Sequence, residues 1–310
     1  MILIDGSHAL YRTLAMNKDK VAEQPEFITH LFINQILSFT TKLGGSKQNR
    51  VVVCFDNASW RKQYYIENKP KDYGKETYKG HRVKDESIDW DKIFSLVNQV
   101  SEALKLYSDF DIMSVKEAEA DDIIAILAKE YGKKETIWIV SSDKDFIQLQ
   151  QPPRINIYDP LKQQFKPSID IELFKQIHIM IGDKSDNIKA IKERLGEKTA
   201  AKLVTELPIL LQTSPTIRER YEFNKNLIDF DYIPEYISKR ILTEYNNSQG
   251  SFNGLQLIKL FKELKLAQHT ENIDKFKLSN DIIKTKLNQT FIEQDRNNRI
   301  SESSLEEFFS

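Results

Sequence analysis

The chain of 310 residues has one cysteine, Cys54, and no long apolar run. A single cysteine excludes a disulfide within the chain, and we expect Cys54 to be a buried small side chain, because it lies inside an apolar segment. No apolar stretch approaches the roughly 20 residues of a membrane helix. The N-terminus also lacks the basic segment and cleavage site of a secretion signal. We therefore expect a cytoplasmic protein without membrane contact.

Histidines are few, and the net charge is close to zero. The net charge is −1, so the whole-chain balance does not indicate a nucleic-acid binder, and local segments must supply that evidence. A hydrophobic content of 40% and a charged content of 29% indicate a globular protein with a sizeable core. The five histidines are scattered without metal-ligand spacing, so we expect structural or surface roles for them: His8, His30, His81, His178 and His269.

Acidic residues, by contrast, stand at the ends of the apolar runs in five regions of the sequence. The carboxyl ends of buried strands border the crevice in which α/β sheets hold ligands. Favourable charge at a helix N-terminus explains one or two of these acids, but not the whole set. Brought together, the carboxylates would repel one another and need cations, and oxygen ligands select Mg²⁺ or Mn²⁺. The acids are Asp5, Asp56, Glu119, Asp121, Asp122, Asp143, Asp145, Asp183 and Asp186.

Alternating strand and helix patterns in the first half predict an α/β fold with a mostly parallel central sheet. Strands are expected at 1–6, from 51, at 109–115, 136–143 and 155–160, with helical spacing over 26–43 and 88–106. A further helix, ending near Tyr131, is expected to open at Ser114, three residues before Glu117, because that is a capping-box spacing. After about residue 166 the patterns are helical: 168–181, 198–206, 217–229, 234–246 and 254–266.

These patterns divide the chain into an α/β domain (1–166), a helical domain (167–266) and a polar tail (267–310) that we expect to have marginal structure. The α/β domain carries a polar insertion, 57–87, that is too long for an ordinary loop. A solvated charged loop is the plain interpretation, but basic residues there alternate with aromatic rings, which can stack on unpaired bases. We predict an arch over the metal site, whose order can depend on bound nucleic acid. Its rings are Trp60, Tyr64, Tyr65, Tyr73 and Tyr78.

Six motifs occur in the order typical of the 5′-nuclease family: LIDGSHALYR, VVCFDN, YKGHR, EAEADD, SSDKDFIQL and GDKSDNI…LGEKTA. The chain resembles these flap endonucleases and 5′→3′ exonucleases of replication over about residues 1–245. NLIDFDYIPEYI resembles the phage branch, of the T-even phage ribonuclease H type. The resemblance implies a PIN-like sheet, then a helical domain with a helix–turn–helix-type duplex-binding motif. It also implies a monomeric, Mg²⁺-dependent, structure-specific 5′-nuclease that removes RNA primers and 5′ flaps in lagging-strand replication, in a bacterial host cell if a phage encodes it.

The resemblance assigns roles to matching positions. Asp5, Asp56, Glu119 and Asp121 would bind a first ion. Asp143, Asp145, Asp183 and Asp186 would bind or orient a second ion, with Asp122 assisting. Lys79 matches the arch lysine that touches the scissile phosphate, with Arg82 as a second contact. Tyr11 and Arg12 would lie beside the 5′ nucleotide. The remaining nucleic-acid contacts are expected from Arg61, Lys62 and Tyr78 in the arch, and from Lys184, Lys189, Lys192, Arg194, Lys198 and Lys202 in the helical half.

Two divalent ions about 4 Å apart would clamp the attacking and leaving oxygens of a phosphodiester and activate water, so this chemistry needs no Ser, Cys or His nucleophile. The family's duplex-binding motif often also holds K⁺. Here, however, the usual Gly-x-Gly turn is replaced by KERLGEK with the single Gly196, which weakens the case for a K⁺ ion. Non-specific phosphate contact remains the expectation for this motif.

The last residues, 302–309, resemble a peptide that binds a sliding clamp, with Leu305, Phe308 and Phe309 as the buried side chains. A tail that folds its own Phe pair onto the core is an almost equal alternative. The sequence leaves open whether a single-stranded-DNA-binding protein is a further partner. Two other functions fit part of the pattern: a catalytically idle scaffold that binds nucleic acid or a clamp, and a PIN-type ribonuclease.

Overall fold

The computed structural model describes residues 1–45, 49–83, 85–248 and 250–279, and within them six strands form one sheet. The order is β3-β2-β1-β4-β5-β6. The strands are β1 (Ile2–Asp5), β2 (Val51–Cys54), β3 (Asp111–Met113), β4 (Ile137–Val140), β5 (Ile155–Asp159) and β6 (Gln164–Phe165). The first five run parallel and β6 is antiparallel to β5. Because β1 lies between β2 and β4, their carboxyl ends meet at one edge of the sheet.

Both faces of the sheet are covered, which explains why its strands read as continuous apolar runs. Side chains alternate between the faces: Ile2 and Ile4 pack toward α1 (Gly6–Met16), α3 (Phe27–Lys42) and α5 (Trp90–Tyr107). Leu3 packs on the other face, against α6 (Ala120–Tyr131) and α11 (Glu235–Asn247). Cys54 is buried on that second face, as expected from its apolar surroundings. The short α2 (Lys18–Glu23) follows α1.

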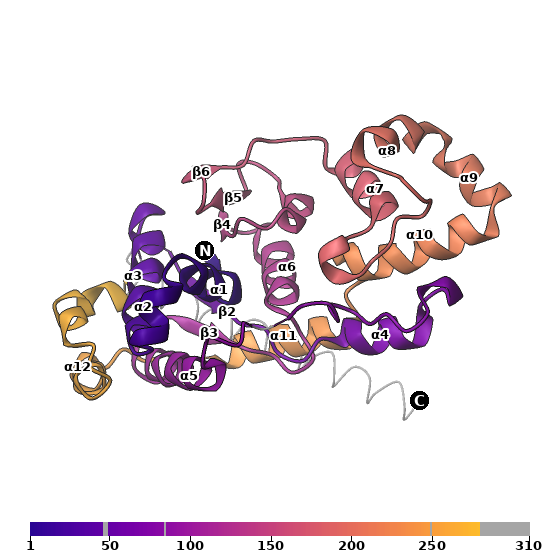
Figure 1. Cartoon of the computed structure of the whole chain (residues 1–310). Helices are drawn as coiled ribbons and strands as arrows, with labels where there is room; N and C mark the ends of the chain where they lie inside the picture. Colours follow the sequence, from indigo (N-terminus) through magenta and orange to yellow (C-terminus); the bar gives the residue numbers. More distant parts are fainter. Residues whose placement is uncertain (46–48, 84, 249, 280–310) are drawn as a thin grey trace, which may run out of the picture.

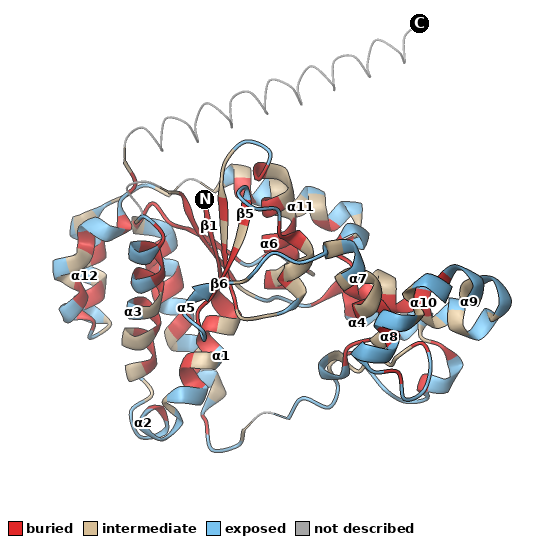
Figure 2. Ribbon diagram, turned by 90° about the horizontal axis from the view of Figure 1, so that it is seen from above, coloured by how far each residue is buried: buried red, intermediate tan, exposed pale blue. Residues whose placement is uncertain are grey.

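A second group of helices stands beside the sheet layer (Figures 1 and 2). It comprises α7 (Ile171–Ile181), α8 (Glu197–Leu203), α9 (Leu207–Thr213) and α10 (Pro215–Ile228), with short 3₁₀ turns η3 (Lys184–Asp186) and η4 (Val204–Glu206). α4 (Trp60–Asn68) and η1 (Lys71–Tyr73), from the predicted arch, share its apolar core. The helical group therefore includes a segment inserted between β2 and β3.

The chain then returns to the sheet layer. α11 packs against α6. α12 (Gly254–Glu263) packs against α5 and against the 3₁₀ segment η6 (Ala267–Phe276), and both join the apolar core on that face of the sheet. Figure 1 shows α12 at the far side of the sheet from α9. The expectation of marginal structure from residue 267 onward is therefore wrong for the first part of the tail, where Ile273, Phe276 and Leu278 are buried. The clamp-like peptide 302–309 lies outside the described residues.

The start of α6 differs from the sequence prediction. Glu119 is the N-cap, and a reciprocal capping box links it to Asp122. Ser114 does not open the helix, because the chain first makes a turn in which Glu117 adopts a positive φ of 66°. The later start decides which of the neighbouring acids faces the sheet edge. Within the described part of the chain, no helix combines the length and apolar character needed to cross a membrane.

Candidate active site

Four carboxylates meet at the carboxyl edge of the sheet, and we call Asp5, Asp56, Asp121 and Asp143 the open cluster. Asp5 ends β1 and caps α1, because one of its oxygens accepts from the backbone N–H of His8 at 2.8 Å. Its other oxygen accepts from Ser141 Oγ at 3.0 Å. Asp56 follows β2 and accepts from the N–H of Ala120 at 2.8 Å, which ties the first turn of α6 to the sheet edge.

Within the described part of the chain, no salt bridge pairs the acids of the open cluster with a basic side chain. Burial, with repulsion from Asp56 and Asp143, raises the pKa of the Asp5 carboxyl to about 7. Burial, with repulsion from Asp5 and Asp143, holds the pKa of Asp121 well above its ordinary value. These shifts have the sign expected when like charges share a dry site. The donor set is entirely oxygen, which suits a hard divalent cation such as Mg²⁺.

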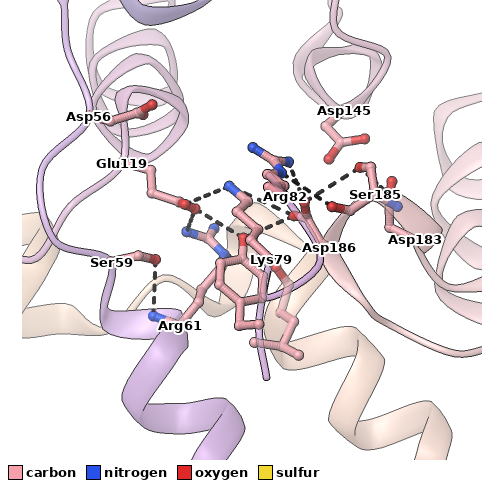
Figure 3. Close-up of polar contacts among 12 residues, drawn as sticks. Asp56, Ser59, Arg61, Lys79, Arg82, Glu119, Asp145, Asp183, Ser185 and Asp186 are labelled. Atoms are coloured by element: carbon pink, nitrogen blue, oxygen red, sulfur yellow. Dashed lines mark hydrogen bonds and ion pairs between the residues drawn. The ribbon is translucent and has the colours of Figure 1, made fainter. Parts of the chain in front are cut away.

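A second set of acids is neutralised by the protein's own basic side chains, and we call Glu119, Asp122 and Asp186 with their cations the paired cluster. Figure 3 labels Glu119 and Asp186 with Arg61, Lys79 and Arg82. Lys79 Nζ lies 2.5 Å from Glu119 Oε1 and 3.8 Å from Asp186 Oδ2. Arg82 Nη2 lies 2.7 Å from Asp186 Oδ1. The predicted phosphate contacts Lys79 and Arg82 therefore rest on acids predicted to be metal ligands.

The buried Arg61 completes the paired cluster from α4. Its Nη1 lies 3.2 Å from Glu119 Oε2 and 2.8 Å from Asp122 Oδ1, and its Nε donates to the carbonyl of Leu227 at 2.9 Å. Burial opposes ionisation of Glu119, but Lys79 and Arg61 outweigh it, and the pKa of Glu119 is lowered. For Asp122 and Asp186, burial outweighs the nearby cations and the pKa is raised.

Three sequence expectations need correction here. Asp122 does not face the open cluster, since its carboxylate is held by Arg61, by Trp60 Nε1 at 3.2 Å and by the N–H of Glu119 at 2.9 Å. Arg61 and Tyr78, expected to contact nucleic acid, are buried, with 3% and 5% of their surface exposed. In this conformation they organise the acids, and the Tyr78 hydroxyl lies 2.9 Å from Asp186 Oδ2.

The aromatic residues of the arch are also buried for the most part. Tyr65 and Tyr73 pack edge-on against Phe223 of α10. Tyr65 also donates to the carbonyl of Asn187 at 2.8 Å, and Asn187 donates to the carbonyl of Thr77 at 2.8 Å. The expectation that these rings stack on bases is wrong for this conformation, because they join α4 and η1 to the helical group. Trp60 is likewise buried, and Tyr64 is half-buried.

A third group brings together residues far apart in the sequence, and we call Asp145, His178 and Asp183 the histidine site. One ligand atom from each lies within 4.8 Å of the others. Burial and repulsion from Asp143 raise the pKa of Asp145 to about 7. Burial opposes ionisation of Asp183, but hydrogen bonds from His178 and Ser185 outweigh it and hold its pKa far below the ordinary value.

His178 is the residue that sequence reasoning missed, since its partners are 33 positions before it and 5 after it. The sequence signal that could have found it is its place on the last turn of α7, four residues before Gly182 and five before Asp183. Gly182 is required there: it has a φ of 67°, and a Cβ would lie 2.3 Å from the carbonyl oxygen of Ile188. This turn aims the histidine and Asp183 toward Asp145.

A cavity of about 530 Å³ connects the three groups. Its lining includes Lys79, Arg82, Asp121, Asp143, Asp145, Asp183 and Asp186. A neighbouring cavity of about 590 Å³ is lined by Tyr11 and Asp56, and Tyr11 is 47% exposed. Arg12 is half-buried and donates to the carbonyl of Pro160 at 3.1 Å. The site can thus present carboxylates on its floor and basic or aromatic side chains on its walls.

The predicted duplex-binding segment presents exposed cations on the helical group. Lys189 differs from the others, because it is half-buried and paired with Glu76 at 3.1 Å. Arg194 adopts a positive φ of 56°, so it makes a left-handed turn of the kind for which glycine is favoured. The exposed members of the predicted set are Lys62, Lys184, Lys192, Arg194, Lys198 and Lys202.

Comparison with known proteins agrees with this geometry. The sequence model described as 5′-3′ exonuclease, N-terminal resolvase-like domain, matches residues 1–178, and that described as T4 RNase H, C terminal, matches residues 197–276. Ribonuclease H of Enterobacteria phage T4 is 30% identical over 302 residues, covering 88% of this chain and 95% of that protein. A 5′-3′ exonuclease of Mycoplasmopsis pulmonis is 28% identical over 222 residues, covering 67% of each chain.

Solved structures show the same fold. The T5 D15 protein co-crystallised with metal ions superposes with a TM-score of 0.57 at 19% identity, covering 86% of this chain and 98% of that one. T5 5′-exonuclease with bound zinc gives a TM-score of 0.52 at 17% identity, covering 94% and 98%. With the acidic sheet edge and the helical group in place, these matches establish that the chain belongs to the 5′-3′ exonuclease family, with a C-terminal region of the T4 ribonuclease H type, and that it is a phosphodiester-hydrolysing nuclease.

Proposed function

We propose that this protein is a Mg²⁺-dependent, structure-specific 5′-nuclease that removes RNA primers and 5′ flaps during lagging-strand replication. The observation that carries the proposal is the open cluster. Burial and repulsion from Asp56 and Asp143 raise the pKa of Asp5 to about 7, and Asp121 and Asp143 line a cavity that Lys79 and Arg82 also line. Relatives named flap endonuclease and 5′-3′ exonuclease, and a T5 flap endonuclease complex with DNA and metal ions, support the substrate class.

The acids fit divalent ions in number and chemistry. We propose one ion at Asp5, Asp56, Glu119 and Asp121, and a second at Asp143, Asp145, Asp183 and Asp186; Mn²⁺ can replace Mg²⁺. Such ions would supply Lewis acidity and activate water for attack on the phosphodiester. Asp122 is left out of this set because its carboxylate is fully buried and engaged by the buried Arg61 and Trp60. Glu119 and Asp186 are kept because Lys79 and Arg82, which are more exposed than Arg61, can turn away from them.

The chain's own residues would position the substrate. Lys79 and Arg82 lie against Glu119 and Asp186, within reach of the cavity, so a bound phosphate can compete for their charge. Tyr11 and Arg12 would lie beside the 5′ nucleotide, given the exposure of Tyr11 on the wall next to Asp56. The exposed cations around α8 would contact duplex phosphates, which positions the enzyme without reading sequence.

The test compares wild type with Asp143→Asn on 5′-flap DNA, a nicked RNA·DNA hybrid and single-stranded RNA, each with Mg²⁺ or EDTA. The Asn side chain can still accept the hydrogen bond from the N–H of Asp145, which is 2.9 Å long in the wild type, so the fold should be kept. We expect wild type to cleave the first two substrates only with Mg²⁺, and Asp143→Asn to bind DNA without cleaving it. The exposed Asp19→Asn is the control, with unchanged cleavage expected.

Other outcomes contradict the proposal in distinct ways. Near-wild-type cleavage by Asp143→Asn would remove the assigned metal role. DNA binding without cleavage by the wild type would indicate a catalytically idle scaffold. Preference for single-stranded RNA would indicate a PIN-type ribonuclease.

Binding to a sliding clamp through Leu305, Phe308 and Phe309 is a separate proposal. A binding assay with a peptide that ends at Ser310 tests it directly.

A further inference from the structure

The imidazole of His178 has an unusual position between two carboxylates. It is 2% exposed and lies on the last turn of α7, where it lines a cavity of about 250 Å³ that shares Lys144 and Ile181 with the cavity lined by Asp145 and Asp183. Its Nε2 atom lies 3.4 Å from Asp183 Oδ2 and 3.6 Å from Asp145 Oδ1. The same ring nitrogen therefore faces one oxygen of each acid.

These separations fit ligands around an ion better than hydrogen bonds. N–H···O bonds in proteins are usually about 2.7–3.2 Å long, which is shorter than either distance. Around an ion with ligands at about 2.1 Å, neighbouring ligand atoms are roughly 3.0–3.4 Å apart and opposite ones roughly 4.2 Å apart. The three ligand atoms here all lie within 4.8 Å of one another, and Asp145 Oδ1 is buried without a hydrogen-bond partner among the described residues.

The other side of the ring allows the required tautomer. A histidine that binds an ion through Nε2 must carry its proton on Nδ1. In the described part of the chain no group accepts from or donates to the buried Nδ1. Without an ion the two carboxylates favour a proton on Nε2. A cation that takes the place of that proton leaves the other proton on Nδ1, where no described group donates in competition, and the Nε2 lone pair then points between the carboxylates.

Lys144 competes with an ion for the histidine site. Lys144 Nζ lies 3.1 Å from Asp183 Oδ2, the oxygen that also faces His178. The Lys144 side chain is 52% exposed, so it can turn to solvent when another cation takes its place. Ser185 donates to the other oxygen of Asp183 at 2.6 Å and fixes the carboxylate orientation.

We propose that His178 supplies a nitrogen ligand to the ion held by Asp145 and Asp183, so that this position takes Mn²⁺, Co²⁺ or Zn²⁺ in preference to Mg²⁺. This inference rests on the proposed function. It adds one nitrogen ligand to the oxygen ligands proposed for the second ion. Imidazole suits these transition-metal ions, whereas Mg²⁺ takes oxygen ligands and gives up water reluctantly. The open cluster keeps its oxygen donors, so the two positions differ in metal preference.

The test is electron spin-echo spectroscopy of Mn²⁺ bound to the full chain, which detects a directly coordinated ¹⁴N nucleus. Wild type should show imidazole ¹⁴N modulation, and His178→Gln should lose it.

Calorimetry measures the dissociation constant of the Mn²⁺ at this position. It should rise about tenfold in His178→Gln, since loss of a supporting metal-site group typically costs that much or more. The Mg²⁺ constant should change less than threefold. His30→Gln, a histidine outside the site, is the matched control and should keep both the modulation and the affinities.

The wild-type spectrum decides the proposal even if a variant fails to fold. Mn²⁺ bound without ¹⁴N modulation would overturn it, as would modulation that persists in His178→Gln. Equal losses of Mn²⁺ and Mg²⁺ affinity would also overturn it, since His178 would then only orient Asp183. Flap cleavage by a wild type that lacks the modulation leaves the proposed function intact. Absence of both Mn²⁺ binding and cleavage would instead remove the proposed function.

Discussion

The open cluster and the paired cluster lie at the same sheet edge and are both rich in carboxylates, but their charges are balanced differently. In the paired cluster, Arg61, Lys79 and Arg82 contact the acids directly. In the open cluster, Asp5 and Asp121 face other acids, and their pKa values are raised. Without an ion, the protein therefore neutralises the paired cluster with its own side chains and leaves the open cluster for external cations. Glu119 and Asp186 can join the proposed ions where Lys79 and Arg82 release them.

The largest expected effect breaks the paired cluster. Arg61→Met removes a buried cation and leaves Glu119 and Asp122 without their partner, so the free energy of unfolding should fall by about 3–5 kcal/mol. Urea unfolding at pH 7 measures this change. The adjacent exposed Lys62→Met is the matched control and should alter the free energy of unfolding by less than about 0.5 kcal/mol. A similarly small effect at Arg61 would mean that the paired cluster does not depend on its buried cation.

Removal of one acid from the open cluster, by Asp5→Asn, should stabilise the metal-free protein. The pKa of Asp5 is about 7 in the fold, above its ordinary 3.8, so the folded state binds the extra proton. The unfolding free energy contributed by Asp5 is therefore highest below pH 4 and falls as the pH rises toward and through 7. Asp5→Asn removes this loss and can still cap α1.

We expect Asp5→Asn to raise the unfolding free energy in EDTA by up to about 4 kcal/mol at pH 8, with a much smaller gain at pH 4. Urea unfolding at the two pH values gives the difference. Saturating Mn²⁺ should reverse the order, because wild type gains more from the cation. Asp19→Asn is the surface control. A lower free energy of unfolding for Asp5→Asn in EDTA at pH 8 would show that burial and repulsion do not destabilise the Asp5 carboxylate.

Lys79→Ala tests whether a residue of the paired cluster also serves the reaction. The loss of one positive charge aimed at the reacting phosphate should slow single-turnover flap cleavage by roughly 10²-fold. The dissociation constant for DNA should change less than about threefold, since many other cations contribute to binding. Equal losses in rate and affinity would make Lys79 only a phosphate anchor. Lys75→Ala, an exposed lysine of the same arch, is the control.

The smallest expected effect concerns the surface cations. Lys198→Ala and Lys202→Ala should each weaken duplex binding uniformly across sequences and reduce the slope of log K against log salt by about 1. Fluorescence anisotropy at several salt concentrations measures the slope. Lys239→Ala on α11, outside the duplex-binding segment, should leave it unchanged. If the slope is unchanged in the first two variants, α8 does not contact the duplex.

The acids at the carboxyl edge of the sheet could be predicted from the sequence, because β-branched runs indicate strands and the carboxyl ends of parallel strands lie at one edge. Asp5, Asp56 and Asp143 follow neighbouring strands for that reason. The choice between Asp121 and Asp122 depends on where α6 begins, and Glu117 shifts that start by a few residues. A single position therefore decides which acid faces the cluster and which one binds Arg61.

Residues that depend on distant partners were harder to predict. Tyr65 and Tyr73 resemble exposed arch residues in the sequence, but Phe223 of α10 makes them core residues. His178 has no local metal-ligand spacing, and only the fold brings it to Asp145. α9 lacks a long apolar period and has Pro208 in its first turn, and the helical patterns predicted from the sequence do not include it.

Proton release on metal binding tests most directly whether the open cluster is held ready for cations. Calorimetric titration of the wild type with Mn²⁺ at pH 7, in two buffers of different ionisation enthalpy, counts the protons released. Asp5 and Asp145 have pKa values of about 7, so each is partly protonated before the cation binds. Burial and the neighbouring acids also raise the pKa of Asp121. We predict the release of about one proton or more per chain, and fewer in Asp5→Asn. Mn²⁺ binding without proton release would contradict the account, because the carboxylates would already be fully ionised.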